Sequence, residues 1–148
     1  VKQVVNNIFA VSYGGIADSG GYSAACVLHD AFGDGTFAAA AKNGADPGTR
    51  AGSGRLVRAG MTRNGLMFGG ETQGFTYTNQ VHTIDAQLGA TPSCTFEEIP
   101  KPAGALWPSG RSYHGVAYDD GADVMWVHGG LDMNMRAGRE LWSFGPVY

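Results

Sequence analysis

The chain is poor in charged residues, which make up only 16% of its 148 residues, against roughly a quarter in an average globular protein. Its ten Lys and Arg residues form no cluster, and its formal net charge is −3. Nucleic-acid binding needs clustered cations that displace counterions, so the charge pattern argues against a nucleic-acid partner. No apolar run approaches the roughly 20 residues that span a bilayer, so no membrane span is expected.

Cysteine is also scarce, and Cys26 and Cys94 are the only two. Two cysteines in a chain of this size do not make a disulfide framework. The composition therefore favours free, partly buried thiols, and a single disulfide between them stays open as the alternative.

Glycine is what the chain has in excess, with 24 residues. A short apolar stretch ends in Gly-Gly three times, at Gly14-Gly15, Gly69-Gly70 and Gly129-Gly130. The second glycines lie 55 (70 − 15) and 60 (130 − 70) residues apart. A period of roughly 50 residues is typical of propeller repeats, in which each unit is a four-stranded sheet. We therefore expect an all-β fold.

Other positions repeat in step with the Gly-Gly pairs. Residues 47–54 and 108–115 share the pattern P-x-x-R-x-x-[S/H]-G, and their prolines lie 61 residues apart (108 − 47). Asn64-Gly65 and Asp120-Gly121 are tight-turn signals that predict a hairpin before the later Gly-Gly pairs, and Asn6-Asn7 holds the same place before the first. Further strands are expected at 23–29, 77–84 and 140–144, and a fourth strand around 36–39 and 94–99.

These motifs resemble the kelch repeat, in which Arg and His open the first strand and Gly-Gly closes the second. The positions that carry the resemblance are Gly14, Gly15, Arg50, Gly69, Gly70, Arg111, His114, Gly129, Gly130 and Trp142. The resemblance implies four-stranded antiparallel blades of a β-propeller over residues 1–148, with approximate blades 1–46, 47–107 and 108–148. In such a unit the glycines allow close approach and the Arg ties loop carbonyls together.

Three blades fall short of the roughly four to eight of a closed propeller. The chain is expected to be a segment of a longer propeller, or to be completed by identical copies or a partner chain. A different β-sandwich or barrel is the remaining alternative.

Several motifs that suggest chemistry are better explained by structure. Residues 17–21 superficially resemble the nucleophile segment of trypsin-like proteases, but every histidine follows Ser19. His29, His114 and His128 lack metal-ligand spacing, residues 119–123 lack the ligand pattern of a calcium loop, and the adjacent Glu97 and Glu98 point to opposite faces of a strand. We predict no catalytic residue, metal or cofactor.

The expected function is that of a non-catalytic protein-interaction or scaffolding module, because loops on a rigid scaffold are common recognition sites. The residues expected to contact a protein partner lie in the loops after the Gly-Gly pairs: Asp18, Ser19, Glu71, Thr72, Gln73, Asp132, Asn134 and Arg136. One alternative is a structural subunit whose open edges are completed by neighbouring subunits in a larger assembly or filament. The other is a fragment of a kelch-type copper-radical oxidase, for which no ligand is placed by motif.

Overall fold

The computed structural model describes residues 9–30, 35–51, 56–59, 63–119 and 121–145. In this part of the chain all regular elements are strands, which confirms the all-β prediction. No helix in it has the length and apolarity needed to cross a membrane. The strands are β1 (Phe9–Tyr13), β2 (Cys26–Asp30), β3 (Phe37–Ala39), β4 (Ala41–Gly44), β5 (Leu56–Ala59), β6 (Arg63–Phe68), β7 (Glu71–Thr72), β8 (Thr76–Tyr77), β9 (Val81–Gln87), β10 (Ser93–Ile99), β11 (Gly115–Asp119), β12 (Val124–His128) and β13 (Leu141–Phe144).

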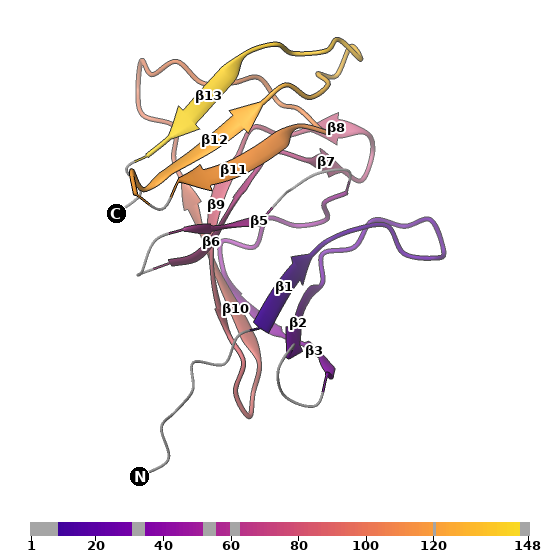
Figure 1. Ribbon diagram of the computed structural model, residues 1–148. Helices are drawn as coiled ribbons and strands as arrows, with labels where there is room; N and C mark the ends of the chain where they lie inside the picture. Colours follow the sequence, from indigo (N-terminus) through magenta and orange to yellow (C-terminus); the bar gives the residue numbers. More distant parts are fainter. Residues whose placement is uncertain (1–8, 31–34, 52–55, 60–62, 120, 146–148) are drawn as a thin grey trace.

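The strands form three successive sheets and a small hairpin (Figure 1). Sheet 1 has the order β1-β2-β3, sheet 2 the order β4-β10-β9-β6-β5, and sheet 3 the order β11-β12-β13, while β7 pairs with β8. Within sheet 2, β5, β6, β9 and β10 make an antiparallel meander. The short β4 then adds to β10 in parallel, so the chain leaves sheet 1 by joining the edge of sheet 2.

The strand before each Gly-Gly pairs with the strand after its loop in the same register in all three sheets. The first pairs are Tyr13 with Cys26, Phe68 with Val81, and His128 with Leu141. In each sheet the partner strand begins eleven residues after the second glycine (26 − 15, 81 − 70, 141 − 130). The spacing of the Gly-Gly pairs therefore marks equivalent strand ends.

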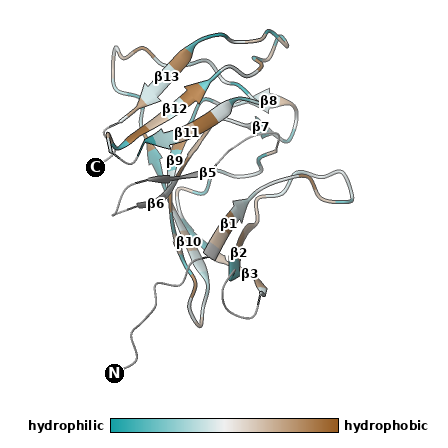
Figure 2. Ribbon diagram, viewed as in Figure 1, coloured by the Kyte–Doolittle hydropathy of each residue, from teal (hydrophilic) through white to brown (hydrophobic). Residues whose placement is uncertain are grey.

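Sheet 2 is the middle layer, because two separate apolar clusters cover its two faces. Met67 and Ile84 pack with Cys26 and Leu28 of sheet 1. The other face contributes Leu66, Phe68 and Val81, which pack with Met125, Val127 and Phe144 of sheet 3. Hydrophobic bands on β11, β12 and β13 are visible in Figure 2. Side chains alternate along a strand, so a strand with both faces covered needs a continuous apolar run such as 66–68.

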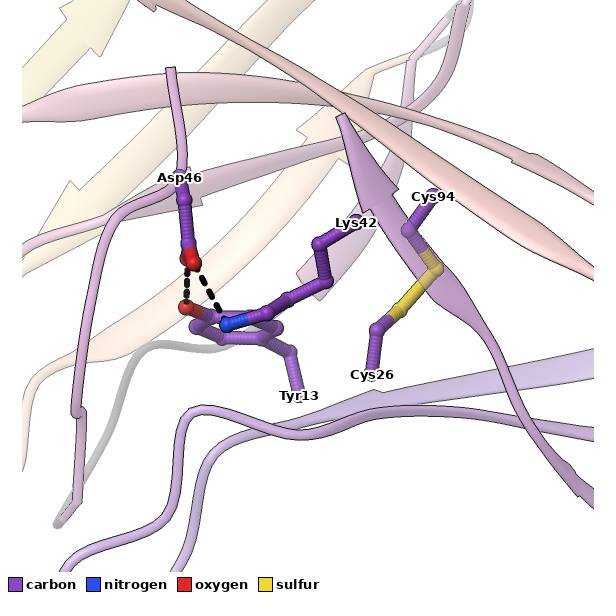
Figure 3. Close-up of a disulfide and its surroundings, with 5 residues drawn as sticks. All are labelled: Tyr13, Cys26, Lys42, Asp46 and Cys94. Atoms are coloured by element: carbon purple, nitrogen blue, oxygen red, sulfur yellow. Dashed lines mark hydrogen bonds and ion pairs between the residues drawn. A yellow bond between two sulfur atoms is a disulfide. The ribbon is translucent and has the colours of Figure 1, made fainter. Parts of the chain in front are cut away.

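The prediction of free thiols is wrong, because Cys26 and Cys94 form a disulfide (Figure 3). Cys26 lies on β2 and Cys94 on β10, and the cross-link ties sheet 1 to sheet 2 within their shared core. The number of cysteines does not show how far apart Cys26 and Cys94 lie in the fold, because that distance depends on how the two sheets pack.

A polar contact lies beside the disulfide (Figure 3). The hydroxyl of Tyr13 donates to Asp46 Oδ1 at 2.6 Å, and Lys42 forms an ion pair with the same carboxylate. Burial and the hydrogen bond to Asp46 raise the pKa of Tyr13. Burial on its own would raise the pKa of Asp46. The hydrogen bonds from Lys42 and Tyr13 outweigh this effect, so the pKa of Asp46 is lowered. This contact holds Asp46, which follows β4, next to β1.

One of the two predicted hairpin turns is confirmed. Asp119 Oδ1 accepts the N–H groups of Gly121 and Ala122 between β11 and β12. Asn64-Gly65 is not a turn, because both residues lie in β6 and Gly65 pairs with Ile84. A turn at Gly65 would break this pairing between β6 and β9. Asn6-Asn7 lies outside the described residues.

We predict that replacing both cysteines by serine lowers the free energy of unfolding by about 4 kcal/mol. The disulfide closes a separation of 68 residues, and this is the chain-entropy cost of that loop in the unfolded state. Urea unfolding of the variant and of the reduced parent protein measures the loss, and the two are expected to agree. Two thiols that react with Ellman's reagent in the native, unreduced protein would contradict the cross-link.

Candidate functional site

Three loops after the Gly-Gly pairs leave their sheets on the same side of the molecule, on the right in Figure 1. We call the segments 14–25, 69–80 and 129–140 loop 1, loop 2 and loop 3. Each is closed by a backbone hydrogen bond to the second glycine's carbonyl, from Ser23 at 2.8 Å, Thr78 at 3.0 Å and Gly138 at 2.8 Å. The donors all lie eight residues after that glycine (23 − 15, 78 − 70, 138 − 130). The loops therefore share one backbone frame.

The backbones of Arg50 and Arg111 are held by the loop of the preceding sheet. Gly15 N–H donates to the Arg50 carbonyl at 2.7 Å, and Arg50 N–H donates to Ser23 at 3.0 Å. In the next unit Gly70 N–H donates to the Arg111 carbonyl at 3.0 Å, and Arg111 N–H donates to Thr78 at 3.2 Å. We call each such pair of hydrogen bonds a clasp. Each clasp connects one sheet to the segment that precedes the first strand of the next sheet.

The arginine side chains point the other way, into their own units. Both are buried, with 6% and 4% of Arg50 and Arg111 exposed. Arg111 donates from Nη1 to the Gly129 carbonyl at 2.9 Å and to Glu140 at 3.3 Å. Arg50 donates from Nη2 to Gln80 Oε1 at 2.7 Å. Gln80 and Glu140 each follow the second glycine by ten residues (80 − 70, 140 − 130), so each arginine connects two sheets.

His114 and Trp142 are packing residues. His114 is buried and meets the ring of Phe68 edge-on at 5.1 Å. Trp142 is half-buried against the cluster that joins sheets 2 and 3. Both residues therefore contribute to the contact between neighbouring sheets.

The three loops also contact one another. Tyr22 in loop 1 donates to Glu71 Oε1 in loop 2 at 2.7 Å, and its ring meets Phe75 edge-on at 6.4 Å. The hydroxyl of Tyr77 in loop 2 lies 3.6 Å from Met135 Sδ in loop 3. The hydrogen bond to Glu71, followed by partial burial, raises the pKa of Tyr22 to about 12. The loops thus form one continuous surface.

The predicted partner-binding residues fall into two groups. Five are exposed at the loop tips: Asp18, Ser19, Gln73, Asn134 and Arg136. The side chains of the other three form hydrogen bonds within or between the loops. Glu71 is only 5% exposed and holds Tyr22. Thr72 donates to the Thr76 carbonyl, and Asp132 accepts the N–H groups of Asn134 and Arg136.

The sequence analysis missed a set of large exposed apolar side chains in and beside the loops. Between 60% and 76% of each is accessible, and we call the set the loop surface: Ile16, Phe75, Tyr113, Met133 and Met135. Four of them lie in the loops, and Tyr113 lies just before β11, next to Ser112, which pairs with Leu131 of loop 3. Phe75, Tyr113 and Met135 also have positive φ angles of 58° to 61°, which bulky residues seldom adopt. The sequence did contain a signal for this surface, because aromatic residues and Met stand out within otherwise polar, glycine-containing loops.

No metal site emerges in the part of the chain that the structure describes. In it, no group of three or more His, Cys, Asp or Glu residues is placed to hold an ion. Glu97 and Glu98 pair with Thr83 and His82 at successive positions of β10, so they point to opposite faces of sheet 2.

Comparison with known proteins assigns no family to the chain. No family model matches it, and no curated protein matches it either. The geometry of the three units is therefore the basis of any functional proposal.

We predict that Gly69→Ala destabilises the protein more than Gly129→Ala. Both glycines have φ near +70°, so both variants carry the same left-handed strain of about 1–2 kcal/mol. A Cβ on Gly69 would lie 2.9 Å from the Arg111 carbonyl oxygen, whereas the nearest atom to a Cβ on Gly129 is at 3.6 Å. Overpacking adds roughly 1–3 kcal/mol to the first variant alone. Equal urea midpoints for the two variants would contradict the close contact between sheets.

We predict that the contact between loops 1 and 2 weakens at alkaline pH. The pKa of Tyr22 is raised from 10.0 to about 12, so the folded state holds the phenol proton more tightly than the unfolded state. The stabilisation is complete below pH 10 and is lost as the pH rises through about 12. Titration of phenolate absorbance, compared between the parent protein and Tyr22→Phe, measures this group. A Tyr22 contribution that titrates at 10 would show that the bond to Glu71 is absent.

Proposed function

We propose that the chain is a segment of a kelch-type β-propeller that acts as a non-catalytic protein-interaction module. Three sheets with one shared register support the repeat. The clasps between consecutive units support a serial arrangement of sheets, as blades require. The loops that bind the partner are the three that follow the Gly-Gly pairs.

The loop surface is the observation that carries this proposal. Aromatic residues and Met are enriched in protein interfaces because they bury large areas with few rotatable bonds to freeze. Here they come from three different sheets and are tied together through Tyr22, Glu71 and Tyr77. Exposed polar residues of the same loops, including Asp18, Asn134 and Arg136, would form the polar rim of such an interface. A partner protein with a complementary apolar patch fits this arrangement.

A structural subunit is the second candidate, and the outer face of sheet 3 favours it. Trp126 and Leu141 remain 37% and 61% exposed on that face. Trp126 lies four residues before Gly130, and Leu66 lies four residues before Gly70, so the two positions are equivalent. Leu66 is buried by the neighbouring sheet. A further sheet, supplied by a neighbouring subunit, would cover this face in the same manner.

We predict that the double variant Phe75→Ala/Tyr113→Ala loses partner binding by 10-fold or more, roughly the effect of removing interface hot spots. The probe is a set of peptides selected from a phage-displayed library against the immobilised chain. Phe37→Ala is the matched control, because Phe37 is 73% exposed but lies on β3, outside the loops. Equal losses in both proteins, or no loss in either, would contradict the loop surface as the binding site.

Light scattering distinguishes the second candidate. A structural subunit has a mass above that of one chain, and Trp126→Asp reduces it to 15.5 kDa while the loop variant does not. A monomer whose peptide binding depends on Phe75 and Tyr113 supports the interaction module instead.

A further inference from the structure

Loop 3 presents two methionine side chains to solvent. Met133 and Met135 are 60% and 65% exposed, whereas Met67 and Met125, which lie in the two cores, are 1% and 0% exposed. Oxidation of a thioether to a sulfoxide replaces a flexible apolar group by a polar one. Oxidation of these two residues would therefore change the chemistry of the loop surface.

Thioether sulfur is the sulfur that an oxidant can reach in this chain. Where a protein has accessible thiolates, these are the usual targets of peroxide. The only two cysteines of the chain, Cys26 and Cys94, are joined in a disulfide that is buried between sheets 1 and 2. Peroxide therefore meets no thiol, and the exposed methionines of loop 3 are open to it.

A tight turn holds Met135 in place. Its N–H donates to the Asp132 carbonyl at 2.9 Å, and Asp132 Oδ1 accepts the N–H of the next residue, Arg136, at 2.9 Å. The φ angle of Met135 is +58°, which residues other than glycine seldom adopt. In this conformation its side chain lies against loop 2, with Sδ 3.6 Å from the hydroxyl of Tyr77.

Tyr77 connects this thioether to the rest of the loop surface. The pairing of β7 with β8 places Tyr77 opposite Glu71, which accepts the hydrogen bond from Tyr22. Partial burial, followed by the charges of Glu71 and Tyr113, raises the pKa of Tyr77. Tyr113 therefore lies within electrostatic range of Tyr77. The hydrogen bond to Met135 is weak, because thioether sulfur is a weak acceptor.

We propose that Met135 is a modification site, at which hydrogen peroxide oxidises the thioether to a sulfoxide and so weakens partner binding. This inference rests on the proposed function, in which the loop surface binds the partner. In the reaction the sulfur attacks one peroxide oxygen, an S–O bond forms and the O–O bond breaks. The sulfur loses two electrons to the peroxide, and the second oxygen leaves with both protons as water.

The sulfoxide changes both the contact between the loops and the surface that they expose. Its oxygen is a stronger acceptor than sulfur, so the hydrogen bond from Tyr77 strengthens and ties loop 3 more firmly to loop 2. The same oxygen makes the apolar surface polar at the point where the loops meet. Burying a polar group against an apolar partner costs free energy, so we expect the oxidised chain to bind about 10-fold more weakly.

Peroxide treatment followed by tandem mass spectrometry of proteolytic peptides tests the modification itself. We expect one added oxygen at Met133 and at Met135, and oxidation at least roughly 10-fold slower at the buried Met67 and Met125. Phenolate titration tests the contact between the loops. The titration of Tyr77, identified by its loss in Tyr77→Phe, is expected to move to higher pH in the oxidised chain, because a stronger acceptor holds the phenol proton more tightly.

Fluorescence anisotropy of a labelled peptide, selected from the phage-displayed library, measures binding after catalase has removed the peroxide. The peptide contains no Met, Cys or Trp, so peroxide carried into the assay does not alter it. Met135→Leu keeps the apolar volume and is expected to bind as the parent chain does, before and after oxidation. Met133→Leu is the matched control, because Met133 is exposed to nearly the same degree. This control keeps Met135 and is expected to keep the loss of about 10-fold on oxidation.

Four results would overturn the inference. They are a Met135 that gains no oxygen while Met133 is oxidised, a Tyr77 titration that oxidation leaves unchanged, a parent chain whose affinity does not change, and an equal loss in Met135→Leu.

The double variant Phe75→Ala/Tyr113→Ala separates these results from a failure of the proposed function. If this variant loses the peptide while oxidation changes nothing, only the inference about Met135 fails. If it binds the peptide as the parent chain does, the loop surface is not the binding site and both proposals fail.

Discussion

In the first two Gly-Gly pairs, a hydrogen bond from the second glycine to the carbonyl of the next arginine holds the sheets in sequence. Gly15 reaches Arg50 and Gly70 reaches Arg111 in the same geometry. The close passage of the arginine backbone explains why the first residue of the pair is glycine: a Cβ on Gly14 would lie 2.4 Å from the Arg50 carbonyl oxygen. Each arginine then buries its side chain in its own unit, so one residue fixes the spacing of two sheets.

This backbone frame has consequences at both ends of the sheets. On the loop side it brings three loops together, and the contacts of Tyr22 and Tyr77 make them one surface. Between the sheets it leaves space that side chains must fill. The Cys26–Cys94 disulfide and its apolar neighbours fill the first gap. The cluster around Phe68, Met125 and Phe144 fills the second gap. The candidate loop surface and the stability of the core therefore depend on the same spacing between sheets.

The sequence predicts the features that have a local signal. The Gly-Gly pairs mark strand ends, and the turn predicted before the third pair is present, with Gly121 in it, because glycine favours backbone conformations that other residues avoid. Asn64-Gly65 carries the same local signal but lies in β6, since pairing with β9 outweighs it. The disulfide, the parallel addition of β4 and the exposure of Phe75 depend on how distant segments pack. No local pattern in the sequence encodes those distances, so the sequence prediction named the exposed polar residues of the candidate site and missed its apolar residues.

Amide hydrogen exchange at the Gly-Gly pairs tests the central claim most directly. The N–H groups of Gly15 and Gly70 donate to arginine carbonyls, whereas no described residue supplies an acceptor to that of Gly130. The account predicts slow exchange at Gly15 and Gly70 and much faster exchange at Gly130, since protection follows hydrogen bonding in stable contacts. Fast exchange at all three glycines would contradict the clasp between sheets, and with it the serial arrangement that positions the loops.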